Sequence, residues 1–317
     1  MKDLESLMER FRGGDPRALA RVISYLENEE SVVEQIMEQI YPFTGKAYII
    51  GITGSPGAGK SSLVDCLTSL LRQKGETVGI VAVDPTSPFT GGALLGDRIR
   101  MQNHATDRGV FIRSMGTRGS LGGLAHTTAD VVKAMDAFGF SRVIVETVGV
   151  GQAELDIMHL ADTVVVVLTP GAGDAIQTIK AGIMEIADVF VINKSDLPGA
   201  DKITAEVEMM LDMQGYQQKW RPPVIKTSTL SGQGIAELLE AIENHRNHLL
   251  QEKALGEKRW SRARNETLEL AQHIWQRIIS RELEHIRPIL DAVARREKDP
   301  YQGAREITSY LLKKYNK

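Results

Sequence analysis

The sequence has 317 residues, of which 42% are hydrophobic and 25% charged, and its formal net charge is −3. These values are typical of a soluble globular protein, and the length allows roughly two domains or one enlarged domain. Disorder, a collagen-like repeat and a disulfide scaffold are excluded, because the chain is apolar enough to form a core and has a single cysteine, Cys66. The slight negative charge gives no electrostatic reason to expect a nucleic acid or an anionic membrane as a partner.

The N-terminal residues do not have the apolar core of a secretory signal. The longest apolar runs fall far short of the ~20 residues that cross a bilayer. A lone cysteine also fits a reducing compartment. We therefore expect a cytoplasmic protein that does not enter the membrane.

The first 44 residues have the pattern of short helices. Apolar side chains recur at helical spacing between Leu4 and Phe11. Asp15 followed by Pro16 predicts the start of a second helix. Ser31 and Glu34 have the spacing of a capping box and predict the start of a third.

From residue 47 onward, short β-branched runs alternate with helical stretches. Strands are predicted at 48–53, 78–84, 110–115, 142–147, 163–168, 188–193 and 223–228, and helices between them at 60–73, 124–138, 174–186 and 201–214. Several of the strands are apolar at nearly every position, which favours a parallel sheet that is buried on both faces. The sequence therefore predicts an α/β fold with a doubly wound, mostly parallel sheet.

The tail from about residue 257 lacks strand patterns and is predicted to be helical, with Pro288 kinking or dividing the run. This tail has 14 Lys and Arg against 9 Asp and Glu, which we interpret as a solvated face rather than a nucleic-acid site. His245 and His248, three residues apart, are also expected on a solvated helix face. We expect three parts, namely a helical segment at 1–44, an α/β domain at 45–255 and a helical arm at 256–317.

A phosphate-binding loop is predicted directly after the first strand. The run Gly54-Ser55-Pro56-Gly57-Ala58-Gly59-Lys60-Ser61 matches G-x-x-x-x-G-K-[ST] and opens a predicted helix. Glycines let the backbone surround a phosphate, and the amides at the helix N-terminus supply positive charge. Lys60 would contact the β- and γ-phosphates, Ser61 would bind Mg²⁺, and Ser62 would hold the α-phosphate.

A base-binding loop is predicted after the strand at 188–193. Asn193, Lys194 and Asp196 form the pattern N-K-x-D, in which a carboxylate can accept from both N1–H and the exocyclic amine of guanine. Adenine lacks those two donors, so it would leave the carboxylate poorly paired. Lys194 would lie along the base, and Asn193 would tie this loop to the phosphate loop. Ser228, Thr229 and Leu230 follow the last strand and would present a backbone amide to the base.

Three acidic residues, Asp84, Asp97 and Glu146, end or follow predicted strands. Mg²⁺ prefers oxygen ligands and keeps several waters, so one direct carboxylate and one or two indirect ones suffice. Glu146 opens the run Glu-Thr-Val-Gly, whose Gly149 amide could sense the γ-phosphate. The metal set is therefore Ser61, Asp84, Asp97 and Glu146, with the direct carboxylate left open. Alternatively, Asp97 caps a helix and Asp84 ends a strand before proline.

With these motifs in view, the chain resembles the family of methylmalonyl-CoA mutase-associated GTPases, the MeaB/ArgK proteins. The resemblance covers nearly the whole chain. It rests on the stretches GITGSPGAGKSSL, VAVDPTSPFTGGALLGDRIRM, VIVETVGVGQAE, PGAGDAIQTIKAGIMEIAD and VINKSD, together with the helical ends. The segment from Val81 to Met101 is much more specific than a phosphate loop alone.

This resemblance implies a Mg²⁺-dependent GTPase that acts as a chaperone for an adenosylcobalamin-dependent mutase. GTP hydrolysis would gate cofactor loading and protect the mutase from inactivation, and the C-terminal helices would form a homodimer. Lys60, Asp97 and Glu146 would serve catalysis, and the segment from Thr169 to Lys180, with Asp174 and Gln177, would couple nucleotide state to the partner. The run Thr-Ser-Thr-Leu at 227–230 departs from the usual Ser-Ala but leaves the amide contact intact.

Two other functions stay open at this point. One is a nucleotide-dependent kinase linked to amino-acid transport, which the guanine-reading Asp196 disfavours. The other is a metal-insertion GTPase for nickel enzymes, which the sequence disfavours because its histidines and cysteine have no metal-ligand spacing. No transition-state arginine can be singled out among Arg98, Arg100, Arg113 and Arg118, and we expect slow intrinsic hydrolysis that a partner accelerates.

Overall fold

The computed structural model describes residues 2–28, 31–84, 104, 106–116, 123–147, 157–171, 184–213 and 219–315. The chain divides into two compact units, residues 1–259 and residues 260–317. In the described part of the chain, no helix has the combination of length and apolar character that a bilayer span requires.

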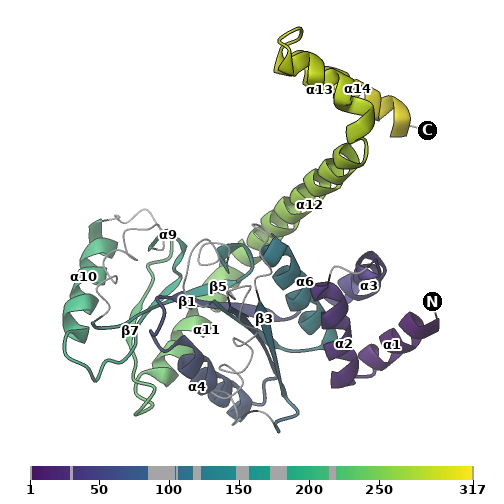
Figure 1. Cartoon of the computed structure of the whole chain (residues 1–317). Helices are drawn as coiled ribbons and strands as arrows, with labels where there is room; N and C mark the ends of the chain where they lie inside the picture. Colours follow the sequence, from purple (N-terminus) through teal and green to yellow (C-terminus); the bar gives the residue numbers. More distant parts are fainter. Residues whose placement is uncertain are drawn as a thin grey trace. The chain divides into compact units, whose positions relative to one another are not determined.

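A seven-stranded parallel sheet forms the centre of the first unit (Figure 1). Its strands are β1 (Tyr48–Gly54), β2 (Val78–Asp84), β3 (Val110–Gly116), β4 (Arg142–Thr147), β5 (Thr163–Leu168), β6 (Val189–Ile192) and β7 (Val224–Lys226), in the order β3-β2-β4-β1-β5-β6-β7. Strands β1, β4, β5 and β6 are buried at every position, as expected for a parallel sheet that is covered on both faces. The predicted doubly wound α/β fold is confirmed.

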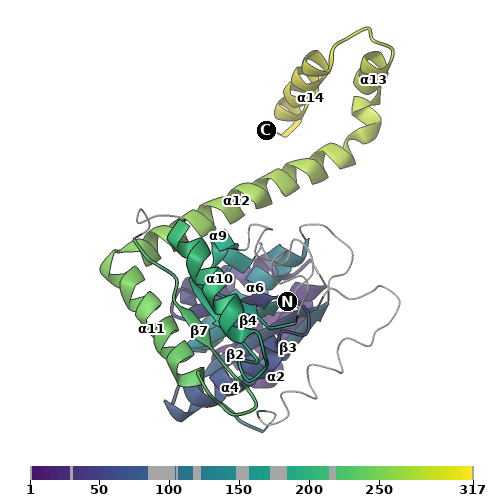
Figure 2. The same cartoon turned by 90° about the vertical axis from the view of Figure 1, so that its left-hand side faces the viewer.

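Helices cover both faces of the sheet. The described ones in this unit are α1 (Lys2–Arg12), α2 (Pro16–Glu27), α3 (Val33–Ile40), α4 (Lys60–Gln73), α6 (Gly123–Phe138), α9 (Met184–Ile186), α10 (Ala200–Met213) and α11 (Ile235–Gln251), with 3-10 turns at Tyr41–Phe43 and Ile157–His159. Apolar side chains of α4 and α11 form one core with the strands, and those of α2, α6 and α10 form the core on the other face. Figure 2 shows α4 and α11 on the same side of the sheet.

The N-terminal helices share the core of the α/β unit. Phe11 of α1 packs edge-on against Phe138 of α6, with ring centroids 5.4 Å apart. Asp15 caps α2 through the N–H of Arg17, as predicted. The capping box at Ser31 and Glu34 was wrong: α3 begins at Val33 after Val32, which makes no side-chain cap bond, so Ser31 lies one position too early to cap it.

The second unit consists of helices. Helix α12 (Ala254–Arg281) begins in the first unit and continues into the second, which also contains α13 (Leu283–Ala294) and α14 (Pro300–Tyr315). The helical run divides at Glu282 rather than at Pro288, which lies inside α13. The Glu282 carboxylate accepts hydrogen bonds from Tyr310, Lys314 and Tyr315 of α14. These donors lower the pKa of Glu282 to about 2, led by the bond from Lys314.

The predicted solvated histidine face was wrong for His245, which is 2% exposed. Its Nδ1 lies 2.8 Å from Oγ1 of Thr163, its Nε2 lies 3.3 Å from the Asp188 carboxylate, and its ring packs against Trp220. Burial lowers the pKa of His245 to about 4. The nearby Lys258 and His248 also lower it, whereas the carboxylates of Asp188 and Asp162 partly raise it. The imidazole is therefore neutral in the folded protein at neutral pH.

This buried histidine predicts acid sensitivity. Below the ordinary histidine pKa of about 6.5, residue 245 is protonated in the unfolded chain. In the folded chain it binds the proton only near pH 4. The free energy of unfolding should therefore fall as the pH drops through this window. Urea unfolding should show that His245→Asn, although less stable at pH 7, loses less stability on acidification than wild type. His159→Asn, at an exposed histidine, should keep the wild-type pH dependence, and an unchanged slope in His245→Asn would contradict the assignment.

Candidate functional site

The predicted phosphate loop lies at the carboxyl end of β1, and two of its glycines leave no room for a side chain. Gly54 has φ 140°, and a Cβ at this position would collide with the carbonyl of Val167 on β5. Gly59 has φ 87°, and a Cβ there would collide with the Asn193 amide. Both positions demand left-handed backbone and close approach, which only glycine provides without strain. The remaining loop residues are Ser55, Pro56, Gly57 and Ala58.

Lys60 and Ser61 begin α4 directly after this loop. The Lys60 side chain is buried, and its Nζ donates to the carbonyls of Gly54 at 2.7 Å and Ser55 at 3.0 Å. The loop thus folds around an ammonium group, next to backbone N–H groups at the start of a helix. This combination of fixed charge and helix N-terminus is suited to an anion such as phosphate. Ser62 follows on the first turn of α4.

Ser61 lies beside one of the predicted acidic residues. Its Oγ donates to Oε1 of Glu146 at 2.6 Å, and Glu146 is only 5% exposed. Glu146 lies on β4, opposite Ile52 of β1 and Ala82 of β2. Asp84 ends β2, the strand next to β4, so its backbone lies at the same edge of the sheet.

Other sequence-predicted residues fall outside the described residues. Asp97 and Gly149 are among them, as is most of the segment from Thr169 to Lys180. The structure therefore brings Ser61 and Glu146 together, places the Asp84 backbone nearby, and leaves the position of Asp97 open. Among the residues described, no group of three or more His, Cys, Asp or Glu could hold a metal ion. A hydroxyl with a carboxylate is an oxygen-only donor set, which fits Mg²⁺ better than zinc or nickel.

Asn193 connects the two predicted loops. It follows β6 and is fully buried, and its Nδ2 donates to the Ala58 carbonyl in the phosphate loop at 2.8 Å. Its Oδ1 accepts from Oγ1 of Thr227 at 3.0 Å. Thr227 is itself fully buried and follows β7. The structure therefore contains the expected link between the loops and adds Thr227, whose place directly after a strand was the only sequence signal for this role.

Asp196 is held at the exposed rim of the same edge. Oγ of Ser228 donates to Oδ1 of Asp196 at 2.6 Å, and the N–H of Ser195 donates to the Thr227 carbonyl at 2.9 Å. Lys194 has φ 57°, which turns the chain sharply between Asn193 and Asp196. A carboxylate offers about four acceptor positions, so the single serine bond leaves capacity for two donors of a ligand.

The last predicted segment forms a turn beside this carboxylate. The N–H of Ser228 donates to the carbonyl of Gln233 at 3.0 Å, and the two residues form an isolated bridge. Thr229 and Leu230 lie in the turn that this bridge closes, and Leu230 is 90% exposed. An apolar side chain this exposed next to a fixed carboxylate is compatible with a planar ligand at the rim.

The buried amide predicts a large cost for Asn193→Ala. The substitution would leave the Ala58 carbonyl and the Thr227 hydroxyl without their partner inside the protein. Two lost buried hydrogen bonds should lower the free energy of unfolding by roughly 2–4 kcal/mol. Chemical denaturation measures this loss, with Asn247→Ala on the exposed surface of α11 as the control. Equal stability of the two variants would show that the bridge between the loops contributes little.

Comparison with known proteins places this geometry in context. The family model described as "Methylmalonyl Co-A mutase-associated GTPase MeaB" matches residues 19–284. A Pyrococcus horikoshii protein, whose name designates it a candidate GTPase, is 50% identical over 307 residues, which cover 96% of this chain and 97% of that protein. GTPase ArgK of Escherichia coli is 32% identical over 327 residues and 98% of both chains.

A mammalian protein and a solved structure are also similar to this chain. The mouse protein named methylmalonic aciduria type A homolog, mitochondrial, is 36% identical over 260 residues, which cover 81% of this chain and 61% of that protein. A crystal structure of a protein named LAO/AO transport system kinase has a TM-score of 0.72 at 25% identity and covers 98% of both chains.

Proposed function

We propose that this chain, which belongs to the MeaB family of methylmalonyl-CoA mutase-associated GTPases, binds and hydrolyses GTP to assist an adenosylcobalamin-dependent acyl-CoA mutase. In this proposal it gates cofactor loading and protects the mutase from inactivation. The observation that carries the nucleotide part is the bond from Asn193 to Ala58, because it holds a phosphate loop and a guanine-type loop at one edge of the sheet.

At the phosphate end, the chain's own residues supply position and charge. Gly54 to Ser62 would surround the phosphates with backbone N–H groups, and Lys60 would turn its ammonium from the loop carbonyls to the phosphate oxygens. Phosphoryl transfer needs mainly positioning and neutralisation of charge, so a buried lysine at a helix start is well placed to serve it. Lys60, Glu146 and Asp97 are the proposed catalytic residues.

A divalent cation fits beside the same residues. Ser61 and Glu146 would hold Mg²⁺, with Asp84 and Asp97 as the further carboxylates. When bound, this ion would neutralise negative charge on the phosphates. The short bond between Ser61 and Glu146 keeps a hydroxyl and a carboxylate oriented in advance, so that little rearrangement is needed.

No arginine is assigned to the reaction. Arg113 donates to the carboxylate of Glu27 on α2, and its guanidinium lies near Ser24. These contacts give Arg113 a structural role between β3 and the N-terminal helices. Arg98, Arg100 and Arg118 lie outside the described residues.

At the base end, Asp196 would select guanine. The Ser228 hydroxyl fixes one carboxylate oxygen, and the remaining capacity would accept from N1–H and the exocyclic amine of guanine. Lys194 would lie along the base, and the turn with Thr229 and Leu230 would close the pocket on the other side. An adenine would leave the carboxylate without those donors, which costs binding free energy.

The nucleotide part is tested by calorimetry with GDP and ADP. Wild type should bind GDP selectively, and Asp196→Ala should lose at least ~2 kcal/mol of binding free energy, or about 30-fold in Kd, because it loses a charged hydrogen-bond pair. Asp201→Ala is the matched control, since its exposed carboxylate pairs with Lys226. Equal affinity of wild type for ADP and GDP, or full GDP affinity in Asp196→Ala, would overturn the proposed guanine site.

The mutase role rests on the family description and on the name of the mouse relative. The homodimer is proposed on other grounds. Helix α12 has no buried side chain among the described residues and exposes large apolar ones, and we propose that a second copy of the chain covers them. The exposed residues concerned are Trp260, Leu268, Ile274 and Trp275.

Mixing the protein with a methylmalonyl-CoA mutase tests this role. The isolated protein should hydrolyse GTP slowly, because no glutamine or arginine directly adjoins the run from Glu146 to Gly149. Addition of the mutase should raise the hydrolysis rate at saturating GTP and produce a complex in size-exclusion chromatography. Fast turnover without the mutase would contradict the first expectation, and neither acceleration nor a complex would count against the chaperone role.

One solved relative is named as a transport system kinase. A kinase would transfer the γ-phosphate to a protein rather than to water. The guanine-type loop disfavours an ATP-dependent kinase. Transfer of labelled phosphate from ATP to a transport protein would support the kinase instead.

A further inference from the structure

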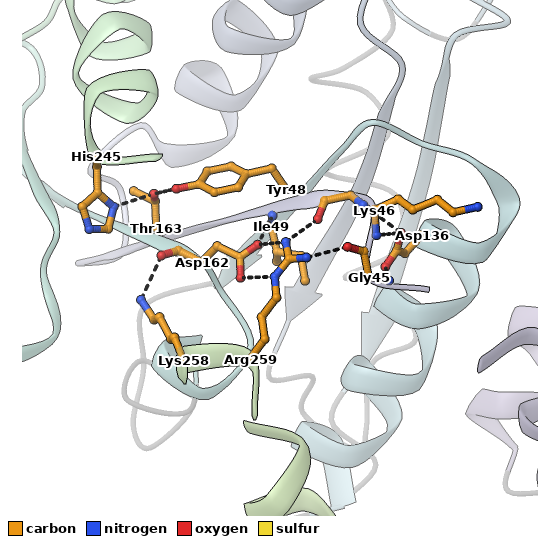
Figure 3. A network of polar contacts seen from close by, with 11 residues as sticks. Gly45, Lys46, Tyr48, Ile49, Asp136, Asp162, Thr163, His245, Lys258 and Arg259 are labelled. Carbon is orange, nitrogen blue, oxygen red and sulfur yellow. Dashed lines mark hydrogen bonds and ion pairs between the residues drawn. The ribbon is translucent and has the colours of Figure 1, made fainter. Parts of the chain in front are cut away.

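A single arginine joins the start of α12 to the amino-terminal ends of two central strands (Figure 3). Arg259 donates to the carbonyls of Gly45 at 2.6 Å and Ala47 at 2.8 Å, just before β1. Its Nη2 and Nε also donate to the two carboxylate oxygens of Asp162, at 2.7 and 3.3 Å, just before β5. The planar guanidinium thus makes four hydrogen bonds at once, one more than the three donors of a lysine could make.

The segment before β1 is held from its other side as well. The Asp136 carboxylate accepts from the N–H groups of Gly45, Lys46 and Ala47, at 2.5, 3.1 and 2.8 Å. The N–H groups of this turn therefore bind α6, while its carbonyls bind α12. Contacts therefore hold this segment on both sides, and a shift at the start of β1 would change one of the two sets.

Asp162 makes the attachment costly to break. Its side chain is fully buried, and Oδ2 also accepts from the N–H of Ile49 at 3.0 Å. Lys258 adds a bond to the carbonyl of Asp162 at 2.8 Å and lies 3.5 Å from the Asp188 carboxylate. Loss of the guanidinium would leave a buried charge without its cation, which is strongly unfavourable. Although burial alone would lower it, the pKa of Arg259 is raised because of the bond and charge of Asp162.

A second link joins the same strand ends on the face that α11 covers. The Tyr48 hydroxyl lies 2.5 Å from Oγ1 of Thr163, which lies 2.8 Å from Nδ1 of His245 (Figure 3). Tyr48 begins β1 and Thr163 begins β5. Side-chain bonds thus tie the beginnings of β1 and β5 together at two points.

The other ends of these strands form the candidate nucleotide site. The two strands pair from Ile50 opposite Thr163 to Gly54 opposite Val167. Gly54 opens the phosphate loop, and the carbonyl of Leu168 accepts from the N–H of Asn193. Two buried, hydrogen-bonded strands therefore run without interruption from the phosphate loop to the contacts of Arg259.

We propose that Arg259 and Asp162 form a latch through which β1 and β5 transmit the nucleotide state to the first turns of α12. The inference rests on the proposed nucleotide function. The two strands pair from Ile50 to Gly54, so in this proposal a change in spacing at Gly54 would reach Gly45 and Asp162 through an unbroken ladder of backbone hydrogen bonds. Since α12 has no buried side chain among the described residues, its first turns are held mainly by this polar latch, by the bonds of Lys258 and by Leu255, which packs partly against the core.

The experiment is hydrogen–deuterium exchange of the full chain with no nucleotide, with GDP and with a non-hydrolysable GTP analogue plus Mg²⁺. In wild type, backbone exchange in residues 45–49 and 254–259 should change several-fold between the three states. In Arg259→Met, which keeps the length of the stem and removes the donors, this dependence should disappear from 254–259. GDP affinity should change by no more than the same several-fold factor, because the coupling between the nucleotide and the latch is reciprocal.

Arg246→Met is the matched control. Arg246 belongs to the same edge and lies over the Tyr48 ring, 5.4 Å from its centroid, but in the described residues it donates only to Glu243. It should keep the wild-type dependence. If Arg259→Met does not fold, as judged by circular dichroism, Arg259→Lys takes its place and should weaken the dependence, because the three donors on the one nitrogen of lysine cannot replace all four bonds of the guanidinium.

Failure of wild type to bind GDP would refute the proposed nucleotide function and, with it, the latch. Binding of GDP without any nucleotide-dependent exchange at 254–259 would overturn the latch and leave the function standing. Retention of the dependence in the Arg259 variant, or its equal loss in Arg246→Met, would also overturn the latch.

Discussion

The close packing of β1 against β5 constrains the rest of the structure. At the carboxyl end of the pair, Gly54 lies so near the carbonyl of Val167 that no side chain fits between the strands. The phosphate loop after β1 also contacts Asn193, which follows β6, the next strand beyond β5. At the amino end, the same two strands meet Arg259. One strand pair therefore determines where the phosphate loop lies at one edge of the sheet and where Arg259 lies at the other.

The two edges use different chemistry for this purpose. At the carboxyl edge, neutral groups connect the loops, since the Asn193 amide bonds a hydroxyl and a backbone carbonyl. Lys60, Glu146 and Asp196, which carry charge there, form hydrogen bonds with carbonyls or hydroxyls. Bonds of this kind can be exchanged for those of a ligand at modest cost. At the amino edge, buried Asp162 is paired directly with the guanidinium of Arg259. Breaking this ion pair would leave a buried charge, so the contact is stable rather than exchangeable.

The sequence predicted the sheet well because local pattern and tertiary environment agree there. The bounds of β2, β4 and β5 match the predicted runs, since buried parallel strands are apolar at most positions. The two loops were also predictable, because their glycines and polar residues follow those strands at fixed spacing. The errors at Ser31 and His245 have another cause. Spacing alone does not show where a helix starts, or that α11 turns His245 toward Thr163 and Asp188.

The role of Arg259 lay beyond sequence reasoning for a related reason. Its partners Asp162 and Gly45 are 97 and 214 positions away in the chain, so only the folded sheet brings them together. In a tail rich in basic residues, the sequence does not distinguish Arg259 from the arginines that are exposed to solvent. The structure does, since Arg259 is the last residue of the first compact unit and Trp260 begins the second. Because Asp162 is buried, Arg259 cannot leave the edge of the sheet without stranding a charge. The first turn of α12 is therefore stabilised by its bonds to the α/β unit. In the proposed latch, a movement of β1 relative to β5 would displace this turn as well.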